Sequence, residues 1–335
     1  MNLASFRSRF QSTFRSTAVL AVLIFGGCNA LSVAQTIERK PSNGGLQAML
    51  HIPMKHAKGA KSDKPSAAVD QGMAKQKIYA FRTVDYPAAT INTVNQYNDT
   101  TAVGYFAYPG SDATPFYFKG TTNHVLVLPN GGYAGVINGI NATGVMVGSF
   151  NDSVGSGLHG FIWNGTAFTV LDYPASFGTE AGGINKAGVV VGDYYDLNGV
   201  EHGFTYSAGT YKAFDRSGAS ATAATGINSN GDIVGAAFYS SAWHGFLLSD
   251  KVYSAIDFPM AEETWASGIN DAGVIAGSFE DSTTTHGFTE TAGAFNQIDV
   301  GGGTTATGIY RVENNNNVVG SAIDSAGESH GIIGR

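Results

Sequence analysis

The sequence predicts an all-β fold: a six-bladed β-propeller of four-stranded blades, closed by an N-terminal strand that completes the last blade. Three observations predict it. A repeat of about 43 residues, the length of one four-stranded blade, runs through residues 78–335. The chain stops inside its last repeat, and the missing strand stands before the first one. Glycine makes up 45 of 335 residues and charged residues only 13%, which suits tight hairpins between short strands.

One repeat is clearest over residues 181–218. Its short runs are dominated by Val, Tyr, Phe and Gly, so they read as strands rather than helices. The four expected strands cover residues 181–185, 189–195, 202–207 and 211–215. Asn185-Lys186-Ala187-Gly188 joins the first two. Asn accepts hydrogen bonds from its downstream backbone and Gly supplies a left-handed position, which predicts a hairpin.

Two signatures align the repeats. The first is an Ile-Asn pair followed seven residues later by Gly, at Ile140-Asn141, Ile184-Asn185, Ile227-Asn228 and Ile269-Asn270. Looser matches stand at Val94-Asn95 and Gly308-Ile309. The second is His-Gly-Phe, beginning at His159, His202, His244 and His286, and ending as His330-Gly331-Ile332. The successive histidines are 43, 42, 42 and 44 residues apart.

The two ends of the repeat region complement each other. Residues 331–335 fall in the third strand of a sixth repeat, with no fourth strand after them. Residues 78–87, IYAFRTVDYP, match the fourth-strand text of residues 167–174, AFTVLDYP, and have no first three strands before them. A ring that pairs these ends removes the exposed sheet edges that an open stack must cap.

Residues 1–34 read as a secretory signal peptide. Arginines precede an apolar run, residues 18–25, that is too short to span a bilayer. Ser32-Val33-Ala34 fits the small-x-small rule of ordinary signal-peptide cleavage, which is the processing we favour. Phe25-Gly26-Gly27-Cys28 resembles a bacterial lipobox but has Phe25 where the lipobox usually has Leu. Membrane attachment is expected only if Cys28 is lipidated. Cys28 is the one cysteine, so no intrachain disulfide can form.

Charge divides the rest of the chain. Residues 35–77 carry eight Lys and Arg against three acids and no aromatic residue, which predicts a disordered basic linker. Residues 78–335 carry eight Lys and Arg against 23 acids, a net charge of −15. So acidic a body excludes nucleic acid as the expected partner and suits cations, neutral polymers or a basic partner. We expect a monomer.

The repeat text resembles the HAF family, probable extracellular repeats known mostly from bacterial sequences. The resemblance rests on the Gly-Ile-Asn-x-x-Gly-x-Val-Val-Gly block at Gly183 to Gly192, the later His-x-Phe, and Trp163 in Phe161-Ile162-Trp163. Glycine stands where the family usually has Ala, which we interpret as a conservative change. The resemblance covers roughly residues 78–335. It implies secretion and a repeat fold, and it implies no activity.

The aligned histidines look like a metal-ligand set, but the fold argues against a shared ion. Blades pack about 10 Å apart, so equivalent positions cannot converge to the ~2 Å that coordination requires. We expect His159, His202, His244, His286 and His330 to be buried structural residues that fasten strands by hydrogen bonds. Acids recur at the ends of the fourth strands: Asp85, Asp172, Asp215, Asp257 and Asp299. We expect these to cap turns, with the hypothesis that each holds a repeated histidine.

A third aligned set is Asp152, Asp196, Asp281 and Asp324, each four residues beyond a second-strand glycine. Hard cations such as calcium favour short oxygen-rich loops of this kind. The spacing matches no EF-hand, however, and an Asp-capped turn is the interpretation we prefer. We therefore expect no cofactor or metal, with calcium as the alternative.

The loops after the second and fourth strands open on one face, and they vary between repeats while the strands do not. Variable loops on a rigid scaffold usually carry binding. Aromatic rings beside carboxylates suit the faces and hydroxyls of sugars. The candidate ligand-binding residues on this face are Phe150, Asp152, Tyr173, Tyr194, Tyr195, Asp196, Tyr239, Glu262, Glu263, Trp265 and Asp281. Phe177, Phe258, Phe279 and Glu180 are expected on the same face.

Two function classes follow. The favoured one is a secreted or cell-surface, non-enzymatic binding or adhesion module for an extracellular glycan or protein. The alternative is a polysaccharide hydrolase or lyase that uses acids such as Glu262, Glu263 or Asp281. The sequence contains no Gly-x-Ser-x-Gly elbow, zinc signature, Walker loop or dinucleotide fingerprint. We therefore assign no catalytic residue.

Overall fold

The computed structural model describes residues 77–335, apart from residue 121 and residues 153–156. The signal peptide expected over residues 1–34 and the linker expected over 35–77 lie outside this part, Lys77 excepted. Within the described ranges, no helix has the length and apolar character needed to cross a membrane. The one helical element there is the short 3-10 helix η1 (Pro129–Gly131).

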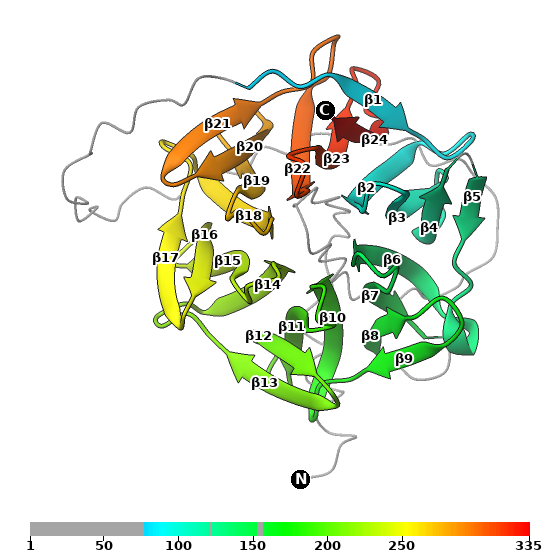
Figure 1. Cartoon of the computed structure of the whole chain (residues 1–335), viewed down its shortest axis with the longest axis vertical. Coiled ribbons are helices and arrows are strands. Elements are labelled where there is room, and N and C mark those ends of the chain that lie inside the picture. Colours follow the sequence, from blue (N-terminus) through cyan, green and yellow to red (C-terminus); the bar gives the residue numbers. More distant parts are fainter. Residues whose placement is uncertain (1–76, 121, 153–156) are drawn as a thin grey trace, which may run out of the picture.

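The strands form six blades, each of four antiparallel strands, and the blades are arranged around a central axis (Figure 1). One parallel pair, Gly178 with Leu158, joins blades 3 and 2, and another, Ile91 with Ser329, joins blades 1 and 6. Blade 1 contains β2 (Ile91–Tyr97), β3 (Thr101–Ala107), β4 (Thr114–Lys119) and β5 (Thr122–Val125). Blade 2 contains β6 (Tyr133–Ile140), β7 (Met146–Asn151), β8 (Leu158–Trp163) and β9 (Phe168–Leu171). Blade 3 contains β10 (Ser176–Ile184), β11 (Val190–Asp196), β12 (Glu201–Ser207) and β13 (Thr210–Phe214).

Blade 4 contains β14 (Ala221–Ile227), β15 (Ile233–Tyr239), β16 (Ala242–Ser249) and β17 (Val252–Ile256). Blade 5 contains β18 (Glu263–Ile269), β19 (Ile275–Glu280), β20 (Thr285–Thr291) and β21 (Ala294–Ile298). Blade 6 contains β22 (Ala306–Val312), β23 (Val318–Ile323) and β24 (Ser329–Gly334), and its fourth strand is β1 (Phe81–Val84). The predicted six-bladed β-propeller is therefore confirmed.

The ring closes where the sequence predicts. Strand β1 pairs antiparallel with β24, with Phe81 opposite Gly334 and Val84 opposite Gly331. Two further backbone hydrogen bonds of 3.0 Å join Ala80 and Arg335 in both directions. Because the fourth strand comes from the other end of the repeat region, no blade among the described residues lacks its outer strand.

The second-strand glycines are required by a bulge in the first strand. At Gly192 an added Cβ would lie 1.9 Å from the carbonyl oxygen of Glu180, and at Gly277 it would lie 2.0 Å from that of Trp265. The equivalent glycines of the other blades, Gly104, Gly148, Gly235 and Gly320, are equally close to a first-strand carbonyl. Glycine therefore permits the bulge, and the third-strand Phe rings pack beside it as the fully buried centre of five blades: Phe116, Phe161, Phe204, Phe246 and Phe288.

The repeated Asn has two roles. The Oδ1 of Asn185 accepts hydrogen bonds from the N–H groups of Ala187 and Val189, which closes its own hairpin. Its Nδ2 donates to the carbonyl of Asn228 in the next blade at 3.1 Å. The same inter-blade bond runs from Asn98 to Asn141, Asn141 to Asn185, Asn228 to Asn270, and Asn270 to Glu313, over 3.0–3.3 Å.

These inter-blade hydrogen bonds, which we call the Asn belt, correct the alignment of the first and last repeats. Tyr97-Asn98 and Val312-Glu313 occupy the Ile-Asn place, not Val94-Asn95 and Gly308-Ile309. In blade 6 a carboxylate replaces the amide. Oε1 of Glu313 accepts a hydrogen bond from the N–H of Tyr97 at 3.1 Å. This bond joins blade 6 to blade 1 and closes the belt.

One arginine fills the axis. The buried guanidinium of Arg311 in β22 donates to backbone carbonyls of blades 2 to 6. The acceptors are the carbonyl oxygens of Asn138, Gly182, Thr225, Ser267 and Tyr310. A single side chain thus binds five of the six innermost strands together.

Candidate ligand-binding face

The repeated histidines lie near the start of the third strand in blades 2 to 6, where the loops after strands two and four meet. We call this side of the ring the Asp–His face. In each case Nδ1 contacts the aspartate that ends the fourth strand, at 2.6–3.2 Å. The pairs are His159–Asp172, His202–Asp215, His244–Asp257, His286–Asp299 and His330–Asp85.

These contacts confirm the hypothesis that each fourth-strand aspartate holds a histidine of its own blade. The pair His330–Asp85 does so across the closure of the ring, 245 residues apart in sequence. The histidines are not buried, however. Their side chains are 16–42% exposed because they stand at the loop end of the strand, two residues before the buried Phe of blades 2 to 5 or the buried Ile332 of blade 6.

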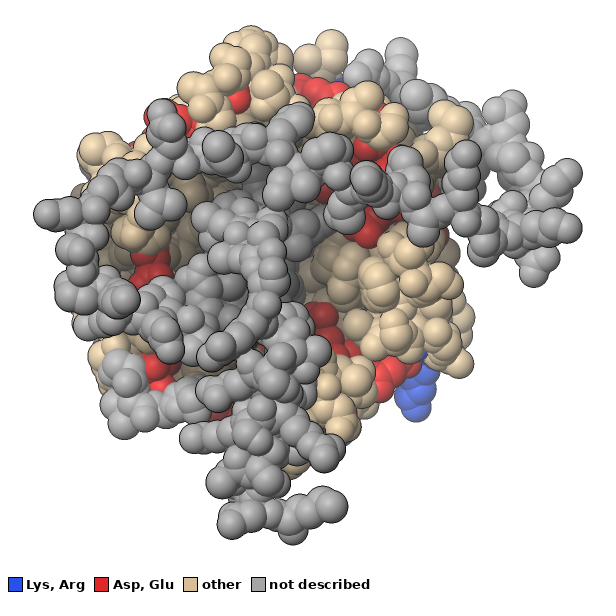
Figure 2. Space-filling view, turned by 180° about the vertical axis from the view of Figure 1, so that it is seen from behind, with Lys and Arg blue, Asp and Glu red and all other residues tan. Residues whose placement is uncertain are grey.

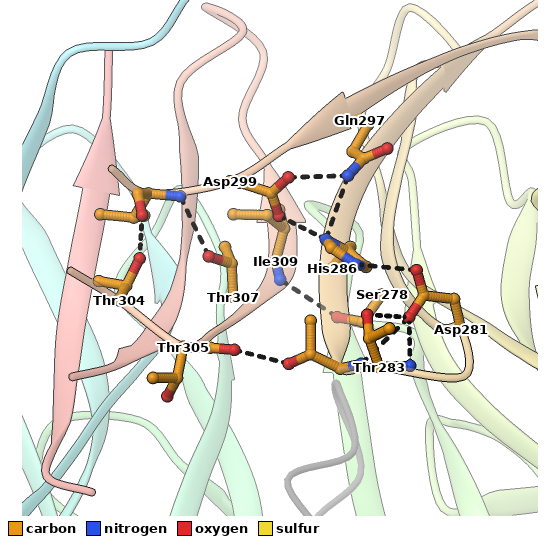
Figure 3. Close-up of polar contacts among 12 residues, drawn as sticks. Ser278, Asp281, Thr283, His286, Gln297, Asp299, Thr304, Thr305, Thr307 and Ile309 are labelled. Carbon is orange, nitrogen blue, oxygen red and sulfur yellow. Dashed lines mark hydrogen bonds and ion pairs between the residues drawn. The ribbon is translucent and has the colours of Figure 1, made fainter. Parts of the chain in front are cut away.

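In four blades the other ring nitrogen faces a second carboxylate. The Nε2 atoms of the histidines in blades 2, 3, 5 and 6 lie 3.5, 3.8, 3.3 and 3.6 Å from the loop acids Asp152, Asp196, Asp281 and Asp324. Figure 3 shows the blade 5 copy, in which His286 lies between Asp299 and Asp281. Gln297 also donates to Asp299 at 2.7 Å.

The loop acids cap the turns in which they stand. Oδ1 of Asp196 accepts from the N–H groups of Asn198 and Val200, and the Val200 bond is the leading cause that lowers the pKa of Asp196. The hydroxyl of Thr283, followed by backbone N–H groups, holds the pKa of Asp281 well below its usual range. The expected Asp-capped turn is therefore present at both loops.

An aromatic residue after the fourth-strand aspartate joins neighbouring blades. Its ring stacks on a second-strand ring of the next blade, with centroids 3.6–3.8 Å apart and planes within 5°. The stacked pairs are Tyr86–Phe106, Tyr173–Tyr194 and Phe258–Phe279. The aspartate thus holds its own blade while the adjacent ring holds the next one, and Tyr173 and Tyr194 each use one ring face on the other.

Two candidate ligand residues are in the core instead. Phe150 is 1% exposed and Trp265 is 5% exposed, because both point between blades rather than out of the loops. Tyr239 is partly exposed; its hydroxyl donates to the Ser217 carbonyl, and Arg216 lies over its ring. Side chains that remain accessible at the surface are Asp152, Tyr173, Tyr194, Tyr195, Asp196, Glu262, Glu263 and Asp281.

The structure adds exposed apolar side chains to this face. Phe177 is 55% exposed, Tyr133 48%, and Met260 99%. They begin a first strand or stand in the loop before it, and Tyr108, Leu197 and Val200 are exposed in loops after second strands. Of these six residues, only Phe177 was predicted on this face from the sequence. The alternation of apolar and polar residues that identifies a strand does not show which loop side chains face solvent.

The Asp–His face is acidic. Where the described residues are visible in Figure 2, carboxylates recur around the ring on this side of the molecule and little positive charge is seen. Lys119, Lys186 and Lys251 instead stand in hairpins of the opposite face. Glu263 and Glu280 are opposite one another in β18 and β19. Burial, followed by the neighbouring carboxylate, raises the pKa of Glu263, and burial likewise raises that of Glu280.

A buried acid lies deeper, between blades 2 and 3. Glu180, which the sequence places on the exposed face, is 1% exposed, and its Oε2 accepts from the Ser149 hydroxyl at 3.5 Å. Burial, followed by repulsion from Glu201, raises the pKa of Glu180 to about 8. Burial and Asp193 raise the pKa of Glu201 well above its ordinary value. Glu180 is therefore part of the core and unavailable to a ligand.

The opposite face has a cavity of about 220 Å³ at the mouth of the axis. The Asn belt forms its wall, Arg311 lies at its base, and Asp99, Lys186 and Asp271 stand on its rim. Sequence analysis missed this cavity, because its lining comes from a residue that differs between blades, Arg311, and from hairpins interpreted as structural only.

No family model matches the chain, and no curated protein matches it in sequence. Solved structures match its fold. A streptogramin B lyase has 11% identity over 76% of this chain and 86% of its own, with a TM-score of 0.44. TolB from Acinetobacter baumannii has 10% identity over 72% and 65%, with a TM-score of 0.49. The fucose-specific lectin from Aleuria aurantia has 12% identity over 74% and 92%, with a TM-score of 0.44. At these identities the matches concern the fold alone.

Proposed function

We propose that this protein is a secreted or cell-surface, non-enzymatic binding module whose Asp–His face takes an extracellular glycan or protein. The observation that carries the proposal is the recurrence of the same surface unit around one face. In five blades a partly exposed histidine is held by an aspartate, and exposed apolar side chains such as Phe177 and Met260 lie at the start of a first strand or in the loop before it, on the same face. Repeated, separate units suit multivalent binding, whereas catalysis needs one convergent site.

The charge of this face and its exposed side chains restrict the chemical class of the expected ligand. An acidic face repels polyanions, so a neutral glycan or a basic protein segment is the expected partner. Partly exposed rings beside carboxylates can stack on sugar faces and accept bonds from sugar hydroxyls. The resemblance of Gly183–Gly192 to HAF repeats and the signal peptide expected over residues 1–34 support an extracellular location. Mass spectrometry of the mature chain from a secreting host would separate cleavage after Ala34 from lipid on Cys28.

The test is a glycan array probed with the purified full chain, followed by measurement of reducing ends released from every bound glycan. Retention without release supports the proposal. Phe177→Ala and Tyr133→Ala should weaken binding, while the matched control Val252→Ala, 65% exposed in a hairpin on the opposite face, should not. Equal loss in all three variants would count against the Asp–His face as the binding surface.

One observation favours the alternative, a polysaccharide hydrolase or lyase. Glu263 and Glu280 are neighbouring acids with raised pKa values, and exposed Glu262 lies beside them. A protonated and an ionised carboxyl in one place is the pair that glycoside hydrolysis needs. Asp281 does not fit the role of acid, because its turn keeps it ionised. If glycans are cleaved, Glu263→Gln and Glu280→Gln should abolish release and keep binding.

A further inference from the structure

Blade 6 differs from the other copies of the Asp–His unit by one acid. Its loop after the second strand is Asp324-Ser325-Ala326-Gly327-Glu328, and Glu328 is exposed. One oxygen of Asp324, one oxygen of Glu328 and one ring nitrogen of His330 lie within 4.8 Å of one another. Imidazole with two carboxylates is a ligand set for borderline divalent metals such as zinc.

The histidine is oriented to ligate. Nδ1 of His330 contacts Asp85 at 3.1 Å, and an ionised carboxylate accepts hydrogen bonds only, so Nδ1 carries the proton. In the neutral ring, Nε2 then presents a lone pair toward Asp324. A carboxylate behind a metal-ligating histidine is a common arrangement, since it fixes the tautomer and the ring orientation.

The spacing of the two inner ligands also suits an ion. Nε2 of His330 and Oδ2 of Asp324 are 3.6 Å apart, longer than an N–H···O hydrogen bond of about 2.7–3.2 Å. Two ligands of a tetrahedral zinc, each ~2.0–2.1 Å from the ion, are about 3.3 Å apart. A lone pair facing a carboxylate at this distance is repulsive, and either a proton on Nε2 or a metal ion between the two atoms removes the repulsion.

We propose that Asp324, Glu328 and His330 form a surface site for a divalent transition metal, with zinc as the probe and Asp85 as the residue that orients His330. The side chains of His330 and Asp324 are 30% and 36% exposed, so an ion can enter from solvent. The site has three protein ligands and leaves coordination positions open to water or to a donor group of another molecule.

Blade 3 supplies a matched control, because its loop has the same turn. Asp196 Oδ1 accepts from the N–H groups two and four residues on, at 2.8 and 2.9 Å, and Asp324 Oδ1 does the same at 2.8 and 2.9 Å. The glycines before the fourth position have φ values of 81° and 83°. Val200 stands where blade 6 has Glu328. Exchange of these two residues therefore moves the third ligand from one blade to another without a change of turn.

The experiment is isothermal titration of the metal-free full chain with zinc, checked by competition with a chromogenic chelator. Glu328→Val should weaken the tightest site at least about tenfold, and Asp85→Asn should weaken it about 10- to 100-fold. Val200→Glu should add a second equivalent of comparable affinity. Zinc should raise the Tm of the wild type more than that of Glu328→Val, whose own Tm without metal checks its folding.

Equal zinc affinity and stoichiometry in the wild type and Glu328→Val would overturn the assignment. Binding of calcium without binding of zinc would overturn it as well, because a hard cation does not select the imidazole. These readouts require no glycan or protein ligand. The metal site and the proposed binding function therefore succeed or fail separately.

Discussion

The replacement of Arg311 by Met should remove the central link of the ring while keeping most of the apolar stem. In the native structure the guanidinium donates to carbonyls of blades 2 to 6, including those of Gly182 and Thr225 at 2.7 and 2.8 Å. A hydrogen bond from a charged donor contributes ~1.5–3 kcal/mol. In the Met variant, water from the adjoining cavity would donate hydrogen bonds to some of the carbonyl groups that lose the guanidinium. We expect a loss of about 4 kcal/mol in the free energy of unfolding, the range found when one partner of a buried charged network is removed.

Urea unfolding at pH 7 measures this loss, with a fall in Tm of about 12 °C as a second readout, since 1 kcal/mol corresponds to about 2–4 °C in a domain of this size. Gln96→Met is the matched control, because Gln96 lines the same cavity but accepts one bond, from the N–H of Ile140. It should lose only about 1 kcal/mol. A loss below about 1 kcal/mol for Arg311→Met, or equal losses in the two variants, would refute the role given to the arginine.

Three further predictions concern stability. Gly192→Ala should lose about 3 kcal/mol in urea unfolding, because the added methyl would meet the Glu180 carbonyl at 1.9 Å; a neutral result would exclude a rigid bulge. Asp215→Ala should lose about 0.5–1 kcal/mol, since the pair with His202 is partly exposed, and an unchanged Tm would contradict a structural role. The pKa of Glu180 is raised to about 8, so the folded chain retains a proton that the unfolded chain loses above pH ~4.5, and stability falls as pH rises toward 8. Glu180→Gln should reduce this loss between pH 5 and pH 8 by about 3 kcal/mol, and pH profiles of equal slope would refute it.

The fold could be predicted because its requirements recur at each blade. A glycine opposite a bulge and a Phe beside it are needed wherever the same four strands pack, so both appear with the period of the blade. The closure was predictable for a related reason. Residues 78–87 contact the same kinds of partner as every other fourth strand. The contact of Asp85 with His330 is one example, and it explains why this segment has the sequence of a fourth strand.

The places where the prediction failed are those where two blades meet the same need with different residues. Asn98 was missed because its hairpin is shorter than the others, and Glu313 because a carboxylate that accepts from Tyr97 replaces the amide of the belt. Phe150 and Trp265 were assigned to the binding face by loop position. Loop position does not determine whether a ring turns outward or between the blades, because that depends on the space left by the neighbouring sheet.

The axis shows most clearly why a repeat cannot be understood one blade at a time. Six innermost strands converge there, and six equal side chains cannot occupy one point. Gly226 and Gly268 place no side chain at the axis, and this leaves room for Arg311. An added Cβ at Gly226 would lie 3.0 Å from the Cα of Gly268, and one at Gly268 would lie 2.6 Å from Cδ of Arg311. The glycine that we interpreted as a conservative replacement for Ala is thus the condition for the arginine. A property of one residue in blade 6 decides what the repeated residue can be in the other blades, and no comparison of blade with blade reveals that dependence.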